Sequence, residues 1–141
     1  MSVYKTKRSE SSIEYLDNAR KLAQFTRQCC LKIPKRYTFF GGIGLANLAD
    51  EVYNKSRMAN SVYPTTKSEA ELRRSYIIQA NASLQALIGQ IDIMSYLLVN
   101  GGQCDSWIYN ALKEWGELTS KQAVLLSKVK KSDKERYKNL C

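Results

Sequence analysis

The sequence predicts an all-α protein, an antiparallel four-helix bundle with up-down-up-down topology. Apolar residues recur at steps of three and four along most of the 141 residues, which is the spacing of helices with one buried face. Only two prolines and seven glycines interrupt this pattern, too few for the many turns of a β-sandwich. The composition, 44% hydrophobic and 25% charged, is typical of a folded globular chain. We expect a single domain over 1–141, with flexible basic ends at 1–10 and 131–141.

The first helix is expected to begin near Ser11. Ser11 and Glu14 have the spacing of a capping box, in which each side chain satisfies a free backbone N–H at the helix start. Pro34 should end this helix, because the residue before a proline disfavours the helical conformation. The expected buried face consists of Ile13, Leu16, Ala19, Leu22 or Ala23, Cys29 or Cys30, and Ile33.

A second helix is expected to begin between Arg36 and Gly42 and to end near residue 60. The glycines at 41, 42 and 44 each cost roughly 1 kcal/mol inside a helix, so they predict either close packing of a neighbouring helix or a late helix start. A phosphate-binding loop is disfavoured, because no strand precedes the glycines and no Lys-Ser/Thr pair follows them. The expected buried residues are Phe40, Ile43, Leu45, Leu48, Val52 and Met58.

The third helix has the clearest pattern in the chain. It follows an expected loop at 61–67, and a second capping box at Ser68 and Glu71 should begin it. Gly101 and Gly102 should end it, since glycine enters the left-handed cap conformation at low cost. The expected buried face, with steps alternating between three and four, consists of Ile77, Ala80, Leu84, Leu87, Ile91, Met94 and Leu98.

The fourth helix is expected to begin at an Asp105 cap and to fray beyond Lys130, where the sequence turns polar and basic. Short loops between four helices make successive helices antiparallel neighbours, which gives the up-down-up-down bundle. The expected buried face of this helix consists of Ile108, Leu112, Trp115, Leu118, Gln122, Leu125 and Val129.

Several kinds of chemistry are excluded by composition. With no histidine, the chain has no Ser-His or Cys-His nucleophile pair and no His-ligated zinc. Cys29, Cys30, Cys104 and Cys141 lack the CxxC spacing, which favours free thiols in a reducing cytoplasm. We expect no enzyme activity, catalytic residue, cofactor or metal site. The polar N-terminus and the polar residues within the third helix predict a cytoplasmic protein with no membrane span.

The formal net charge of +9 is concentrated near the two ends of the chain: +6 over 1–36, −2 over 37–120 and +5 over 121–141. In the expected bundle, the start of the first helix, the loop between the second and third, and the end of the fourth meet at one end. Such a basic field attracts polyanions, and Tyr4, Tyr53, Tyr63 and Tyr137 in the same segments could stack on unpaired bases. The alternatives are a solvated face that only confers solubility and a surface that binds an acidic protein. A membrane surface is less favoured, because the basic segments lack a strong opposing apolar face.

Lys32, Lys35 and Arg36 form a second basic cluster at the opposite end, either a second contact or cations at a helix C-terminus. Lys55 and Lys138 lie in the basic segments that meet at the first end of the bundle.

Apolar residues that flank the buried face of the third helix predict a homo-oligomer. They are Tyr76, Ile78, Ile88, Ile93 and Leu97. The residues predicted to bind nucleic acid are Lys5, Lys7, Arg8, Lys32, Lys35, Arg36, Arg57, Lys67, Arg73, Arg74, Lys128, Lys130, Lys131, Lys134 and Arg136.

The turn at 32–37 reads Lys-Ile-Pro-Lys-Arg-Tyr, and a helix with the sequence of 45–60 follows it. With these features the chain resembles, over roughly residues 12–130, the accessory variability determinant proteins of diversity-generating retroelements. Those are similar to proteins encoded by intervening sequences in bacterial 23S ribosomal RNA genes. The Gly41, Gly42 and Gly44 cluster has no match in that pattern.

The resemblance implies a homopentameric, non-enzymatic protein that binds nucleic acid through a basic surface and associates with a reverse transcriptase. The complex would support mutagenic cDNA synthesis from a template RNA, and Lys32, Lys35 and Arg36 are the matching cations of the turn. We therefore predict an RNA-binding accessory subunit, with DNA left open as a second ligand. The alternative is an oligomeric helical scaffold that binds an acidic protein partner and has no nucleic-acid role.

Overall fold

The computed structural model describes residues 3–100 and 106–141, and it describes side chains from residue 13 onward. The described residues form four long helices, two short helical turns and no strand, which confirms the predicted all-helical fold. The helices are α1 (Val3–Lys32), α2 (Ile43–Asn60), α3 (Lys67–Asn100) and α4 (Ser106–Arg136). A 3₁₀ turn, η1 (Lys35–Tyr37), and a π-helical turn, η2 (Thr38–Gly42), join α1 to α2.

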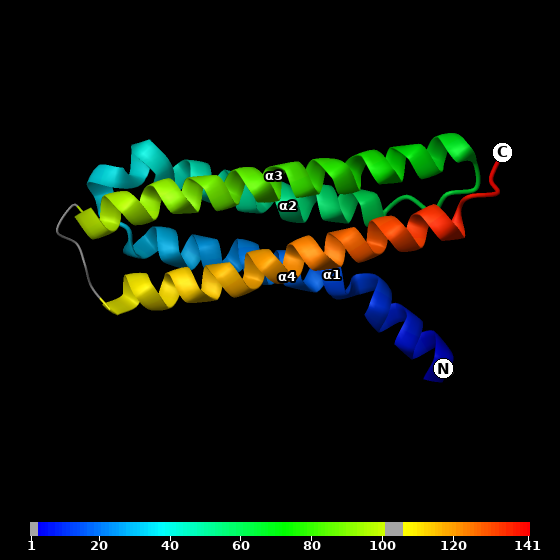
Figure 1. The fold of residues 1–141 in the computed structure, drawn as a ribbon, viewed down its shortest axis with the longest axis horizontal. Coiled ribbons are helices and arrows are strands. Elements are labelled where there is room, and N and C mark those ends of the chain that lie inside the picture. The colour runs from blue at the N-terminus through cyan, green and yellow to red at the C-terminus, as the bar shows by residue number, and fades with distance from the viewer. Residues whose placement is uncertain (1–2, 101–105) are drawn as a thin grey trace.

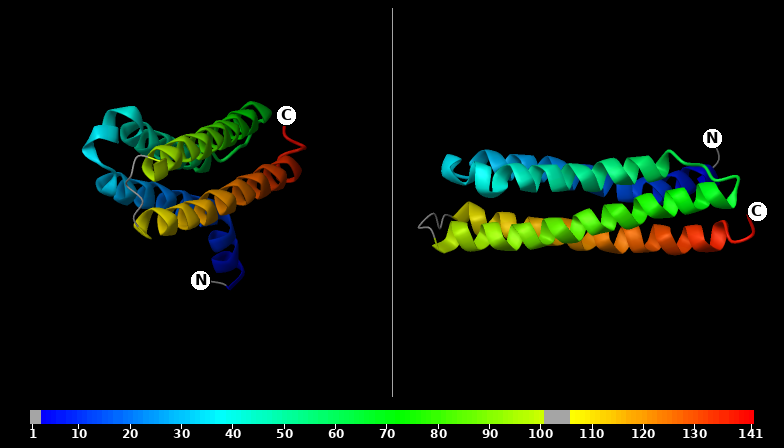
Figure 2. Two further views of the ribbon diagram at one scale, coloured as in Figure 1. Left: turned by 60° about the vertical axis from the view of Figure 1, so that its left-hand side comes forward. Right: turned by 90° about the horizontal axis from the view of Figure 1, so that it is seen from above.

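The four helices lie lengthwise beside one another, as Figures 1 and 2 show. Helix α1 packs against α2 and α4, and α3 packs against the same two helices. The first turns of α1 bend away from the other helices. The end of α2, the start of α3 and the end of α4 lie at one end of the molecule, at the right of Figure 1. Residues 67–74 and 130–138, far apart in sequence, are thereby brought to the same end.

The two predicted capping boxes are wrong. Helix α1 begins at Val3, so Ser11 lies inside it; residues 3–10 contain no glycine or proline that would stop a helix from extending. Helix α3 begins at Lys67, one residue before the expected box, and the Glu69 backbone N–H donates to Thr66 Oγ1 at 3.2 Å. The Glu69 carboxylate in turn accepts from the Thr65 backbone N–H at 3.1 Å. The cap lies two residues earlier than predicted, because threonine hydroxyls are available directly after Pro64.

Two of the predicted helix ends are confirmed, and the end of α4 differs from its prediction. Helix α1 ends at Lys32, just before Pro34, and α2 ends at Asn60, both as predicted. Helix α4 does not fray at Lys130 but continues to Arg136. The predicted cap at Asp105 and the predicted stop at Gly101 and Gly102 fall outside the described residues.

The glycine cluster before α2 forms a π-helical turn, and the regular α-helix begins late, at Ile43. A Cβ on Gly41 would collide with Cε of Met94 on α3, so a side chain there would require the end of Met94 to move. A Cβ on Gly42 or Gly44 would have no atom within 4 Å, so packing does not require glycine at these two positions.

Helix α2 buries a different face from the one predicted. Phe40, Ile43 and Met58 are exposed, and these three predictions are wrong. The prediction favoured large apolar residues, whereas small residues on α2 face the core and let α3 approach closely. Leu48 is half-buried. The buried residues of α2 are Leu45, Ala49, Val52, Ser56 and Ala59.

The other helices follow their predicted faces more closely. All seven predicted residues of α3 are buried, while Leu112, Leu118 and Val129 of α4 are only partly buried at the edge of the core. On α1, Ile13 is 45% exposed and Tyr15 is buried in its place, so the prediction for Ile13 is wrong. The remaining predicted core positions of α4 are buried: Ile108, Trp115, Gln122 and Leu125.

Polar side chains join α1 to α4 inside the core. Asn18 Nδ2 donates to Gln122 Oε1 at 2.9 Å, and Gln122 Nε2 donates to the Tyr15 carbonyl at 3.0 Å. Trp115 Nε1 donates to Thr26 Oγ1 at 2.9 Å. Among the described residues, every buried side-chain nitrogen and oxygen has a hydrogen-bond partner. Buried polar groups satisfied in this way fix the register of the two helices.

Helix α3 is, among the described residues, long and apolar enough by length and composition to cross a membrane. A core helix can meet the same two criteria. Its buried face packs against α2 and α4. The absence of a membrane span stays a prediction.

Candidate nucleic-acid interface

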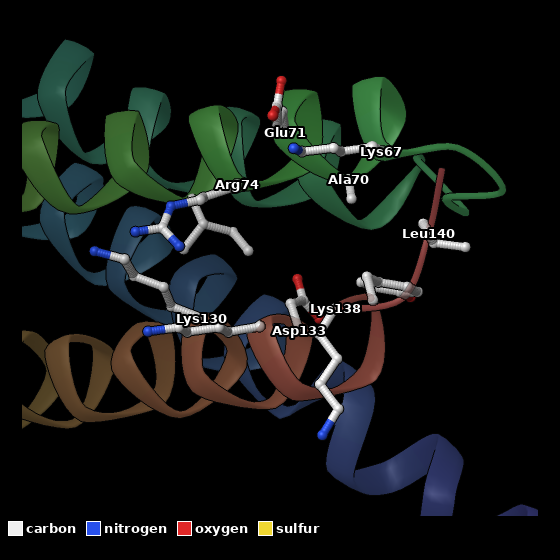
Figure 3. Close-up of a pocket in the computed structure, with 11 residues that line it drawn as sticks. Lys67, Ala70, Glu71, Arg74, Lys130, Asp133, Lys138 and Leu140 are labelled. Atoms are coloured by element: carbon white, nitrogen blue, oxygen red, sulfur yellow. The ribbon is translucent and has the colours of Figure 1, made fainter.

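A groove of about 230 Å³ lies between the first turns of α3 and the last turns of α4. We call it the basic groove. Figure 3 shows Lys67 and Arg74 projecting from α3 on one side, with Lys130 and Asp133 of α4 on the other and Leu140 of the C-terminal segment at one end. The basic groove is lined by Lys67, Ala70, Glu71, Arg74, Ile77, Lys130, Asp133, Lys134, Tyr137, Lys138 and Leu140.

The charge that lines the basic groove is mainly positive. Its five lysine and arginine side chains come from two helices and the segment after α4, and all five are exposed. The two lining carboxylates offset little of this charge, since Asp133 is bound to Arg73 and the Glu71 carboxylate points away from α4 in Figure 3. Lys138 also pairs with Glu135 at 2.5 Å. The packing of α3 on α4 therefore brings together cations that are more than fifty residues apart.

Arg73 does not belong to this surface, and its prediction as a nucleic-acid contact is wrong. The residue is 7% exposed, and its Nε donates to Asp133 Oδ2 at 2.6 Å. Its Nη1 donates to the carbonyls of Ala59 and Val62, each at 3.2 Å. Arg73 lies one step of four before Ile77 on the buried face of α3, and this periodicity is the sequence signal that identifies it as internal.

The Arg73–Asp133 pair joins α2, α3 and α4 beneath the basic groove. Burial alone would lower the pKa of Arg73, but the hydrogen bond and charge of Asp133 outweigh burial and raise that pKa. Because arginine keeps its charge, the buried Arg73 needs the Asp133 carboxylate as a partner. The pair holds the end of α4 against α3, and so sets the spacing of the groove walls.

The C-terminal segment closes one end of the basic groove. The Tyr137 N–H donates to the Asp133 carbonyl at 2.9 Å, and the Lys67 N–H donates to the Cys141 carbonyl at 3.0 Å. These bonds place the side chains of Tyr137 and Leu140 in the groove lining. The sequence prediction missed Leu140, because nothing in its local pattern shows that the segment returns to α3.

Several predicted cations lie outside the basic groove. Arg57 is exposed beside α1, where it donates to the Tyr53 hydroxyl at 3.1 Å. Lys128, Lys131 and Arg136 are exposed on α4 but do not line the groove. The structure therefore brings together Lys67, Arg74, Lys130 and Lys134 of the predicted set.

The predicted turn cations lie at the other end of the molecule, near the end of α1. Lys32 Nζ is 5.9 Å from the centroid of the Trp107 ring, and the guanidinium carbon of Arg36 is 4.9 Å from the centroid of Tyr37. Lys35 is exposed beside them. The side chains of Lys5, Lys7 and Arg8 fall outside those described.

The residues that the structure describes contain no cluster suited to a metal ion, and one of their free thiols is buried. No three His, Cys, Asp or Glu side chains among them are grouped so as to hold a metal ion. Cys29 is buried, and burial raises the pKa of its thiol to about 12, so this thiol stays protonated near neutral pH.

Comparison of the chain with models of protein families, with curated proteins and with solved structures finds no match. The function is therefore inferred from the residues of this chain. The resemblance to accessory variability determinant proteins stays a prediction.

Proposed function

We propose that the chain is a non-enzymatic, nucleic-acid-binding accessory subunit of a reverse transcriptase in a diversity-generating retroelement. It supports mutagenic cDNA synthesis from a template RNA, and RNA is its principal ligand. In this proposal the four helices form an up-down-up-down antiparallel bundle, and the protein acts as a cytoplasmic homo-oligomer, with a pentamer expected from the resemblance.

The observation that carries the proposal is the basic groove. Phosphate contacts by lysine and arginine release condensed counterions, and this release supplies most of the affinity of nonspecific nucleic-acid binding. Cations that converge from two helices strengthen the local field more than the same cations spread over the surface. The carboxylate of the neighbouring Asp133 is paired with the buried Arg73, so it neutralises little of the charge of the lysine and arginine side chains at the rim.

Exposed apolar residues on α3 support the oligomer in this proposal. Ile78, Ile88 and Ile93 are between 38% and 56% exposed, while Tyr76 and Leu97 are half-buried. Apolar surface on several sides of a helix is typical of a contact between subunits. The assembly would place several basic grooves along one RNA.

Co-expression with the reverse transcriptase of the same element tests the proposal. We expect the wild-type chain to co-purify with the tagged enzyme and with template RNA. A variant that carries Arg74→Glu and Lys130→Glu should keep the enzyme and lose the RNA, because both substitutions reverse charge in the groove. The double variant Lys113→Glu with Lys121→Glu, which makes the same total charge change at exposed positions outside the groove, is the matched control. RNA capture that is weak in the wild type, or unchanged in the groove variant, would contradict the proposal.

A scaffold that binds an acidic protein, without nucleic acid, is the second candidate. It is favoured by the far end of the molecule, where Phe39 and Phe40 of η2 are 88% and 81% exposed close to Lys35. Adjacent exposed phenylalanines beside cations suit an acidic segment with apolar anchors. Loss of protein partners in a Phe39→Ser, Lys35→Glu variant, together with no RNA binding by the wild type, would favour this candidate.

A further inference from the structure

The floor of the basic groove is apolar although its rim is cationic. Ile77 is 1% exposed and lies beneath the groove, and Ala70, Tyr137 and Leu140 are half-buried around it. Lysine and arginine side chains on a mainly polar surface would suffice to bind phosphate alone. An apolar floor adds affinity only for a ligand that also carries an apolar face.

The dimensions of the groove limit what can reach this floor. At about 230 Å³ it is smaller than the sites of roughly 300–1,000 Å³ that enclose drug-sized ligands. A flat ring system fits such a space. A nucleic-acid duplex keeps its bases paired inside and presents phosphates and sugars, so it would touch the rim without reaching the floor.

We propose that the basic groove binds one unpaired nucleotide of a single-stranded nucleic acid. The base lies on the floor formed by Ile77, Tyr137 and Leu140, and the adjoining phosphates lie at the rim. Lys67 and Arg74 contact the backbone from α3, while Lys130 and Lys134 contact it from α4. This inference rests on the proposed function, and it narrows the ligand of that site to unpaired strands.

Tyr137 is the residue that makes the floor suitable for a base. Its backbone is held by the Asp133 carbonyl, and the guanidinium carbon of Arg136 lies 5.9 Å from the centroid of its ring. Stacking of a base on an aromatic side chain contributes about 1–3 kcal/mol and tolerates any base. The groove should therefore select for strandedness and not for sequence.

Fluorescence anisotropy with three probes of equal phosphate number tests the inference: an oligouridine, an abasic oligonucleotide and an RNA duplex. We expect the oligouridine to bind at least about fivefold more tightly than the other two, from stacking of one base. The variant Tyr137→Ser with Leu140→Ser should bind all three probes equally and should keep the wild-type affinity for the abasic strand. Arg74→Glu should weaken binding of all three.

The control is Tyr96→Ser, an exposed tyrosine on the opposite half of α3 that should leave the preference intact. Leu140 follows the end of α4, so the single variant Leu140→Ser should leave the helices intact. Its preference for oligouridine over the abasic strand therefore tests the floor even if the double variant folds poorly. Equal binding of abasic strand and oligouridine, or of duplex and oligouridine, by the wild type overturns the inference while the proposed function stands. Failure of all three probes to bind overturns both.

Discussion

The buried pair of Arg73 and Asp133 gives the sharpest prediction about stability. Asp133→Ala leaves the charged Arg73 side chain, which is 9% exposed, without its carboxylate. The Ala59 and Val62 carbonyls still accept hydrogen bonds from it, but they carry no compensating charge. Arginine cannot lose its proton to escape this cost. Removing one partner of a buried ion pair typically lowers the free energy of unfolding by about 3–5 kcal/mol.

The chain contains a matched control for this change. Arg27 and Asp50 form an ion pair with the same 2.6 Å separation, but the Arg27 side chain is 66% exposed and the Asp50 side chain 30%. An exposed pair contributes about 0–1 kcal/mol, so Asp50→Ala should cost no more than that. Burial is therefore the main difference between the two experiments.

Urea unfolding followed by circular dichroism measures both effects. With a slope of about 2 kcal/mol per molar urea, Asp133→Ala should lower the midpoint by about 1.5–2.5 M and Asp50→Ala by at most about 0.5 M. The double change Arg73→Met, Asp133→Leu should be at least about 2 kcal/mol more stable than Asp133→Ala, since it leaves no buried charge. Equal midpoints for Asp133→Ala and Asp50→Ala would refute the assignment of a buried structural pair.

Further predictions concern packing, hydrogen bonding and pH. Gly44→Ala should raise the free energy of unfolding by about 1 kcal/mol, whereas Gly41→Ala should raise it less, because the terminal methyl of Met94 must move; urea midpoints compare them. Trp115→Phe should cost about 1 kcal/mol or more through the lost bond to Thr26, also measured in urea. Burial raises the pKa of Tyr15 and of Cys29 to about 12, above ordinary values of 10.0 and 9.0, so the unfolded chain loses these protons first. The contribution of these two groups to the free energy of unfolding should therefore be fully present below pH 9 and decline from there toward pH 12. Thermal midpoints that rise between pH 9 and pH 12 would contradict the burial of both groups.

The sequence predicted best where periodicity alone decides the structure. Helix α3 is confirmed at all seven predicted core positions, because its steps of three and four repeat without interruption. The same pattern extended back by four residues reaches Arg73, but its charge suggested a surface position. Helix α2 was less predictable, since its buried face uses Ala49, Ser56 and Ala59, which carry little hydrophobic signal.

The candidate site was predictable in part. Convergence of basic segments from α3 and α4 followed from the predicted topology, and Lys67, Arg74, Lys130 and Lys134 do line one groove. The apolar floor was not predictable, because it depends on the return of the C-terminal segment to α3 through the Lys67 N–H and the Cys141 carbonyl. A contact between residues this far apart leaves no periodic trace in the sequence.

The salt dependence of RNA binding tests most directly the central claim that the groove cations hold phosphates. The wild type is compared with a variant carrying Arg74→Glu, Lys130→Glu and Lys134→Glu, and with a control of equal charge change, Lys21→Glu, Lys113→Glu and Lys121→Glu. The logarithm of the binding constant should fall with the logarithm of salt concentration, and the groove variant should reduce that slope by about 2, at roughly 0.7 for each lost phosphate contact on a single strand. The control should keep most of the wild-type slope. Equal slopes for the groove variant and the control would contradict the claim.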